Sequence, residues 1–194
     1  MNIPPVTRTI LLLNVACFLL QINFYQPVMI WFALWPQPGD LLAALPWHAP
    51  WQLVTYSVLH GDFFHLFFNM FAVWMFGSKL EMVWSGRRLA LSYLIAIIAG
   101  GVAQAIVGNM LYTNGAPIIG ASAGVFGILL AYALVFPRDR IMLLIPPIPL
   151  PARVFVTLYA VLELYLGLSG GDGVAHFAHL GGLIGGWAGY RYLR

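Results

Sequence analysis

Apolar runs long enough to cross a lipid bilayer follow one another along most of this chain, and no other feature restricts its fold as strongly. Of the 194 residues, 61% are hydrophobic and only 8% are charged, whereas about a quarter of the residues in a soluble domain are charged. A soluble fold has too little interior to bury this much apolar surface. We therefore expect a membrane protein, with one domain over residues 1–194.

A spanning helix needs about 20 apolar residues, and breakers and charges divide the chain into six runs of suitable length. The expected fold is an all-α polytopic bundle of six transmembrane helices. The six expected spans are 9–25, 63–80, 89–111, 120–136, 153–168 and 174–193. The first run has no small-residue cleavage site after it, so we expect it to remain as a helix.

The nine cationic residues lie in four groups, and two apolar runs separate each group from the next. With six spans, all four groups fall on one side of the membrane. Basic residues favour the cytoplasmic side, so we expect both termini to be cytoplasmic. This orientation also accounts for a pI near 9.2, and no nucleic-acid partner is needed to explain it.

Two connections and one cysteine complete the expected topology. Residues 26–61 contain four tryptophans, whose rings favour the headgroup region, so we expect an interfacial loop and not a seventh span. The four are Trp31, Trp35, Trp47 and Trp51. The connection 137–151 is rich in proline, and we expect it to be irregular. Cys17 is expected to pack as a small apolar residue.

Strongly polar side chains are costly within a membrane and tend to mark functional sites. Those within the expected spans are His65, Asn69, Ser122, Glu163, His176 and His179. At 1.5 Å per residue, His65, Ser122 and His179 lie about 18–24 Å from the nearest cytoplasmic cation. Asn69 is one turn below His65 on the same helix face. A shared depth on three helices that run in the same direction indicates one common site.

The chemistry of these side chains suits acyl transfer. A serine hydroxyl becomes a nucleophile when a base within hydrogen-bond reach accepts its proton, and His179 is the candidate base for Ser122. The N-terminal end of the fourth span, together with His65 and Asn69, can supply donors to a developing oxyanion. Small residues three or four positions apart share one helix face and let helices approach closely. They are Gly120, Gly124, Gly127 and Ala131 in the fourth span and Ala178, Gly182, Gly186 and Gly189 in the sixth.

The residues that carry this chemistry resemble the motifs of the rhomboid intramembrane serine proteases. Residues 120–123 (GASA) resemble the family's G-x-S-x motif around its serine. His60, His65 and Asn69 match its H-x4-H-x3-N pattern on the second helix. Residues 178–186 (AHLGGLIGG) match its A-H-x-x-G-x-x-x-G pattern on the sixth.

The resemblance implies a serine endopeptidase that cleaves transmembrane or juxtamembrane segments of other membrane proteins without a metal or an organic cofactor. It assigns Ser122 as nucleophile, His179 as general base, and His65, Asn69 and the Ser122 N–H as the oxyanion hole. Supporting residues would be Gly120, Gly182, Gly186 and Phe126, the last packed against the catalytic histidine. The expected location is a prokaryotic inner membrane, with the site opening to the extracytoplasmic side. Nothing in the sequence indicates an oligomeric state.

Other polar groups receive different interpretations. We expect His60 and His176 to form hydrogen bonds in loops or at the interface. His176 and His179 could share a metal, but no third protein ligand is evident in the sequence. Asp172 is about 10 Å along a helix from His179, too far for direct contact, so a dyad is preferred over a triad.

Two acidic side chains remain, one within the fifth expected span and one directly after the second. Glu163 is expected near mid-membrane and directed into the bundle, with no role assigned. Glu81 is expected to stabilise its own loop through Lys79, Arg87 or Arg88.

Two other classes of function remain as alternatives. A non-proteolytic relative that binds client helices would be expected to lack Ser122 or His179, and both are present. A small transporter would place polar residues along a path to the cytoplasm, but the residues below Asn69 are mostly apolar. Proteolysis is therefore the preferred function.

Overall fold

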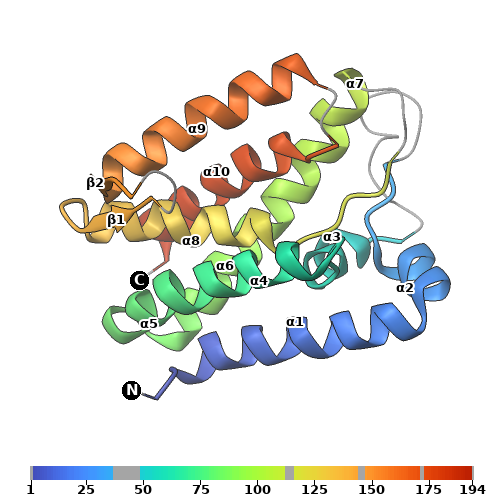
Figure 1. Ribbon diagram of the computed structural model, residues 1–194, viewed down its shortest axis with the longest axis horizontal. Coiled ribbons are helices and arrows are strands. Elements are labelled where there is room, and N and C mark those ends of the chain that lie inside the picture. Colours follow the sequence, from blue (N-terminus) through green and yellow to red (C-terminus); the bar gives the residue numbers. More distant parts are fainter. Residues whose placement is uncertain (1, 37–48, 112–115, 144–146, 171–172, 194) are drawn as a thin grey trace.

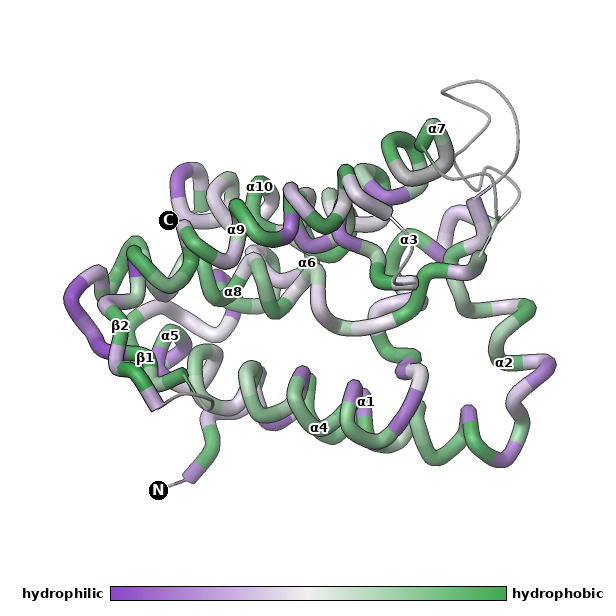
Figure 2. Tube along the Cα trace, turned by 45° about the horizontal axis from the view of Figure 1, so that its top comes forward, coloured by the Kyte–Doolittle hydropathy of each residue, from purple (hydrophilic) through white to green (hydrophobic). Residues whose placement is uncertain are grey.

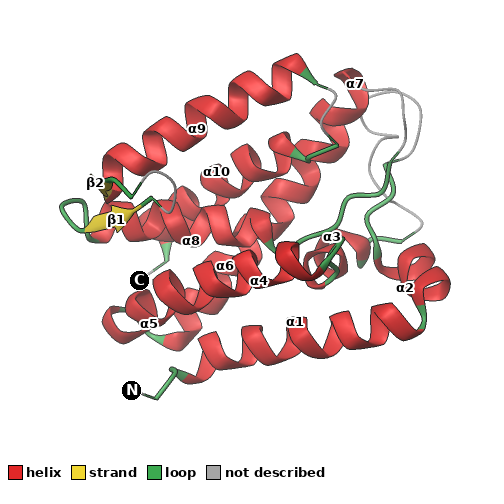
Figure 3. Cartoon of the chain, viewed as in Figure 1, coloured by secondary structure: helices red, strands yellow, loops and turns green. Residues whose placement is uncertain are grey.

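Helices make up almost all of the regular structure (Figure 3). This computed structural model describes residues 2–36, 49–111, 116–143, 147–170 and 173–193. The helices are α1 (Pro5–Asn23), α2 (Tyr25–Phe32), α3 (Gln52–Thr55), α4 (Phe63–Ala72), α5 (Ser78–Val83), α6 (Gly86–Ala103), α7 (Asn109–Leu111), α8 (Ser122–Val135), α9 (Ala152–Ser169) and α10 (His176–Tyr192). A 3₁₀ turn, η1 (Tyr56–Val58), follows α3, while the π-helical turns η2 (Val73–Gly77) and η3 (Gln104–Gly108) join α4 to α5 and α6 to α7.

Four helical stretches among the described residues are long and apolar enough to cross a bilayer. They are Pro5–Asn23, Phe63–Val83, Gly86–Val107 and Ala152–Ser169, and they correspond to the first, second, third and fifth expected spans. Helix α8 is apolar but has 14 residues, and α10 has 17. The chain is therefore a multi-pass helical membrane protein, while the number of six spans stays a prediction.

Hydrophobic residues run along the helices throughout the bundle (Figure 2), and many of them have exposed side chains. On α1, Leu12 and Ile22 are 63% and 58% exposed, and on α9 Val161 and Leu168 are 62% and 66% exposed. Monomeric soluble proteins rarely expose apolar patches of this extent. Lipid chains are the solvent that suits these two helices, which flank the rest of the bundle in Figure 1.

The basic residues lie in segments at one of the two ends of the bundle, which can be followed in Figure 1. One end holds the start of α1, the turn between α5 and α6, the last described residues, and the strands β1 (Arg140–Met142) and β2 (Pro149–Pro151). The opposite end holds α2, α3 and α7. The described arginines and the lysine all belong to segments at the first end. The basic residues thus gather on one side of the bundle.

The connections contain more regular structure than the sequence suggested. The expectation of an irregular connection at 137–151 is wrong, because β1 and β2 pair there as antiparallel strands with Ile141 opposite Leu150. The prolines of β2 lie in an edge strand, where a missing N–H is tolerated. In the first connection, α2 and α3 are short helices. Trp47 lies outside the described residues.

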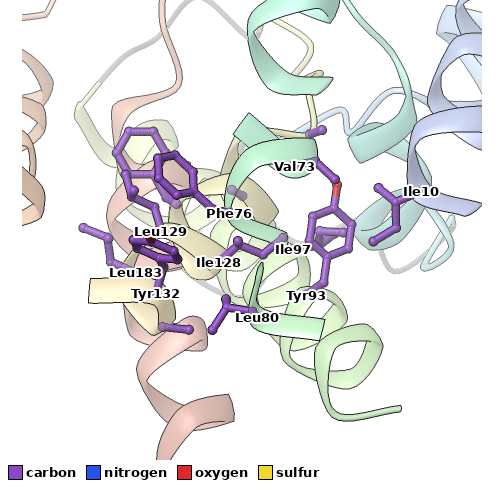
Figure 4. Packing of buried hydrophobic residues seen from close by; sticks show 14 of the residues in the cluster. Ile10, Val73, Phe76, Leu80, Tyr93, Ile97, Ile128, Leu129, Tyr132 and Leu183 are labelled. Atoms are coloured by element: carbon purple, nitrogen blue, oxygen red, sulfur yellow. The ribbon is translucent and has the colours of Figure 1, made fainter. Parts of the chain in front are cut away.

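Helices α6, α8 and α10 form the centre of the bundle, with α1, α4 and α5 packed beside them (Figure 4). Figure 4 shows Ile128 and Leu129 of α8 between side chains of the neighbouring helices. The backbones of α8 and α10 lie in direct contact. A Cβ atom added to Gly182 would lie 2.2 Å from the carbonyl oxygen of Ala123, and one added to Gly186 would lie 2.3 Å from that of Gly127. Only glycine permits this approach.

Glu81 joins α5 to the start of α1. Its carboxylate accepts hydrogen bonds from the backbone N–H groups of Val6 and Thr7, at 2.9 and 2.7 Å, and from the Thr7 hydroxyl. The first N–H groups of a helix have no partner within the helix, and a negative charge is favourable at that end. The expected role of Glu81 within its own loop is therefore replaced by capping of α1. Lys79 instead contacts Asp139 and Tyr132.

Candidate active site

Ser122 is the first residue of α8, at the end of an anchored loop. The loop pairs with the first connection through the Leu34–Ile118 bridge, and the Gly120 N–H donates to the Tyr56 carbonyl at 3.0 Å. Gly120 has a φ of 127°, which a residue with a side chain rarely adopts. This turn directs the chain into α8, whose first N–H groups have no acceptor within the helix. Ser122 is half-buried.

His179 lies in the first turn of α10 with its ring against this serine. Its Nε2 is 2.8 Å from Ser122 Oγ. The residue is buried, with 9% of its surface exposed. The start of α10 is held by Gln104, whose side-chain oxygen accepts a hydrogen bond from the Ala178 N–H at 3.1 Å. The structure therefore brings together two residues that are 57 positions apart in the chain.

The other ring nitrogen of His179 contacts an acidic residue that the sequence analysis left without a role. Glu163 Oε2 lies 2.7 Å from His179 Nδ1 and 2.7 Å from His176 Nδ1. All three side chains are buried. His176 was expected in a loop or at the interface, and this is wrong because its ring is 3% exposed. The expected dyad of Ser122 and His179 did not include Glu163. The depth of Glu163 in the membrane, close to that of His179, was the feature of the sequence that could have indicated this contact.

A row of stacked aromatic rings begins at His179. Phe126, one turn into α8, stacks on His179 with 4.4 Å between ring centroids and 9° between planes. Tyr159 of α9 also stacks on Phe126, with 5.3 Å between ring centroids, and Phe155 stacks on Tyr159 at 5.5 Å. The contact of Phe126 was expected from the family resemblance, whereas Tyr159 and Phe155 were not singled out.

His65 presents a hydrogen-bond donor to the turn before Ser122. Its Nδ1 accepts from the Gly61 N–H at 3.3 Å, so the proton of the neutral ring resides on Nε2. A Cβ added to Gly120 would lie 2.8 Å from that Nε2 and 3.5 Å from Ser122 Oγ. The Nε2–H of His65 thus lies against Gly120, two residues before the serine.

Asn69 and His60 both contact His65. The Asn69 amide donates to the His65 carbonyl at 2.8 Å, which uses one of its two N–H bonds. His60 is fully buried, with its ring edge-on to His65 at 5.0 Å. Burial lowers the pKa of His60 to about 3, so this ring is neutral and adds no charge next to His65.

The cluster of Glu163, His176 and His179 is also the one set of described residues that could hold a metal ion, with ligand atoms within 4.8 Å of one another. Two histidines and a glutamate form a known zinc ligand set. However, ligands about 2.1 Å from a tetrahedral zinc stand roughly 3.4 Å apart, and the nitrogen–oxygen distances here are 2.7 Å. This spacing fits hydrogen bonds. Asp172, the other acidic residue considered beside His179, lies outside the described residues.

Comparison with known proteins gives consistent matches. A family model described as the Rhomboid domain matches residues 48–194. Rhomboid protease GluP of Bacillus subtilis is 31% identical over 150 residues, which cover 77% of this chain and 26% of GluP. Rhomboid protease GlpG of Pectobacterium atrosepticum is 29% identical over 182 residues, which cover 93% of this chain and 59% of GlpG. The chain therefore spans less than two thirds of the length of either relative.

Proposed function

The chain belongs to the rhomboid family, and we propose that it is an intramembrane serine endopeptidase that cleaves transmembrane or juxtamembrane segments of other membrane proteins. The observation that carries this proposal is the 2.8 Å contact between Ser122 Oγ and His179 Nε2. The names of its relatives GluP and GlpG, both rhomboid proteases, support the same activity.

In the proposed reaction, Ser122 Oγ attacks the carbonyl carbon of the scissile peptide bond while His179 Nε2 accepts the hydroxyl proton. The carbonyl oxygen becomes an oxyanion, which the free N–H groups at the start of α8 and the Nε2–H of His65 stabilise. Asn69 contributes its remaining N–H bond. When the C–N bond breaks, His179 returns the proton to the leaving amine. His179 then deprotonates a water molecule that attacks the acyl-enzyme, and returns that proton to Ser122 Oγ as the acyl C–O bond breaks.

The position of Ser122 suits a site below the outer membrane surface. The 14 residues of α8 rise about 21 Å, which is less than a hydrocarbon core of about 30 Å. Because α8 ends beside the basic end of the bundle (Figure 1), Ser122 would lie within the membrane, toward the opposite side. We infer six spans in one domain over 1–194, cytoplasmic termini in a prokaryotic inner membrane, and a site that opens outward.

A fluorescent fluorophosphonate tests this proposal, because it labels only an activated serine. Purified protein in mild detergent is compared with Ser122→Ala and His179→Ala, and Ser169→Ala serves as the matched control. Ser169 is exposed and donates to the Tyr165 carbonyl. We expect labelling of the wild type and of Ser169→Ala, and none of the other two variants.

Cleavage of a model transmembrane substrate should follow the same pattern. Labelling that persists in Ser122→Ala would place the reactive serine elsewhere. A folded wild type that neither labels nor cleaves any substrate would contradict the proposal and favour a client-binding relative.

A further inference from the structure

Glu163 of α9 contacts His179 on the side of the ring opposite Ser122. We propose that Glu163 is a positioning residue of the site, which holds His179 in the tautomer and orientation that accept the Ser122 proton, with His176 fixing the carboxylate. This inference rests on the proposed function, because it assigns the group that acts through the general base. It adds a third member, supplied by α9, to a site that the sequence motifs place on α4, α8 and α10.

The arrangement of protons around Glu163 follows from two short contacts. One carboxylate oxygen, Oε2, lies 2.7 Å from the Nδ1 atoms of both histidines. A proton on that oxygen could be donated to only one of the two nitrogens. An ionised carboxylate can accept from both. His179 therefore carries its proton on Nδ1, and the lone pair of its Nε2 faces the Ser122 hydroxyl at 2.8 Å. That tautomer is the one a general base requires.

The charge of the Glu163 carboxylate is buried together with both histidines. Glu163, His176 and His179 are 5%, 3% and 9% exposed, and a charged group at such a site requires direct hydrogen-bonding partners. The two Nδ1–H donors supply them. When His179 accepts the proton of Ser122 it becomes an imidazolium, and the carboxylate then lies in direct contact with the new positive charge. A counter-charge already in place needs no reorganisation during the reaction.

The packing of α9 aligns the Glu163 carboxylate with the two histidines. Tyr159, Glu163 and Gly167 recur at i, i+4 spacing and therefore share one helix face. Tyr159 stacks on Phe126, Glu163 contacts both histidines, and a Cβ added to Gly167 would lie 3.1 Å from His176 Cβ. Three successive turns of α9 thus contact the site. The geometry points to a helix that supports His179 along its ring edge and, through Phe126, on its ring face.

Steady-state kinetics of Glu163→Gln test the inference. Glutamine keeps the size of the side chain and removes its charge. Loss of the corresponding carboxylate in soluble serine proteases costs about 10⁴-fold in kcat. We expect kcat to fall about 10²- to 10⁴-fold, with KM changed less than threefold and with unchanged thermal stability in detergent. Glu163→Asp keeps the charge and should recover at least tenfold of the loss.

Glu81→Gln is the matched control. It makes the same chemical change at a buried glutamate that contacts α1 and not the site, so its kcat should equal that of the wild type. An active wild type whose Glu163→Gln variant retains kcat within threefold would overturn the inference and leave the proposed function intact. An inactive wild type would contradict the proposed function itself.

A spectroscopic measurement on the wild type covers the case in which Glu163→Gln fails to fold. In protein labelled with ¹⁵N at histidine, the ring nitrogens report the tautomer directly. We expect His179 to carry its proton on Nδ1 and to have an unprotonated Nε2. A proton on Nε2 in the neutral ring would overturn the inference.

Discussion

Replacement of Gly182 by alanine tests whether the contact between α8 and α10 sets the distance from Ser122 to His179. The added Cβ would lie 2.2 Å from the Ala123 carbonyl oxygen, which is a backbone atom and cannot rotate away. An ordinary van der Waals contact requires at least 3.4 Å between the added Cβ and that oxygen, in place of 2.2 Å. The two helices must therefore move apart by about 1.2 Å. His179 is one turn from Gly182 and would move with α10.

The expected losses follow from this displacement. A shift of about 1 Å in a catalytic group can cost about 10²-fold in rate, and overpacking of a closely packed interior costs about 1–3 kcal/mol in stability. We therefore expect cleavage of a model transmembrane substrate, and the rate of fluorophosphonate labelling, to fall about 10²-fold. The melting temperature in detergent should also fall.

Gly77→Ala provides the matched control for this experiment. A Cβ added to Gly77, in the π-helical turn η2, would have its nearest contact at 3.5 Å, with the Thr7 hydroxyl. This variant should keep its activity and its melting temperature, since the helix accommodates alanine at that position. If Gly182→Ala retained activity and stability equal to those of Gly77→Ala, the close approach of α8 and α10 would not determine the geometry of the site.

Three further substitutions probe other contacts. Glu81→Gln removes the charge that caps α1 and should reduce stability by about 1–2 kcal/mol in thermal unfolding, without loss of specific activity; unchanged stability would contradict the capping role. Phe126→Leu removes the ring stacked on His179 and should slow labelling up to about tenfold, so wild-type labelling would show that stacking does not orient the histidine. The hydrogen bond from Lys79 holds the pKa of Asp139 below its ordinary value, and a lowered pKa gives stability that disappears as pH falls through the folded value. The wild type should therefore melt above Asp139→Asn at neutral pH, and a difference that persisted in acid, where the carboxylate is protonated, would contradict this contact.

The architecture of the spans could be predicted because lipid imposes a simple condition on the sequence. A spanning segment must satisfy its backbone hydrogen bonds internally and present apolar side chains outward, so its position is visible in local composition. Residues 63–80 and 153–168 were expected as spans, and the corresponding helices cover Phe63–Val83 and Ala152–Ser169. The connections obey no such condition. For this reason the hairpin of β1 and β2 was missed.

The candidate site was partly visible because three of its helices carry local motifs. The sequence singled out Ser122, His179 and His65, and the structure places all three around the start of α8. Their catalytic roles stay predictions until the variants are measured. Glu163 and Tyr159 lie on α9, where no motif singles them out.

The sequence by itself determined that this chain must lie in a membrane, where its apolar helices run, and which polar side chains need an explanation. Only the tertiary structure decided which of those side chains meet. The contacts of Glu163 with His176 and His179 depend on the orientation of α9 about its own axis and on its height beside α10. Both are set by packing against neighbouring helices. A rotation of α9 by half a turn would leave its composition unchanged and would direct Glu163 into lipid.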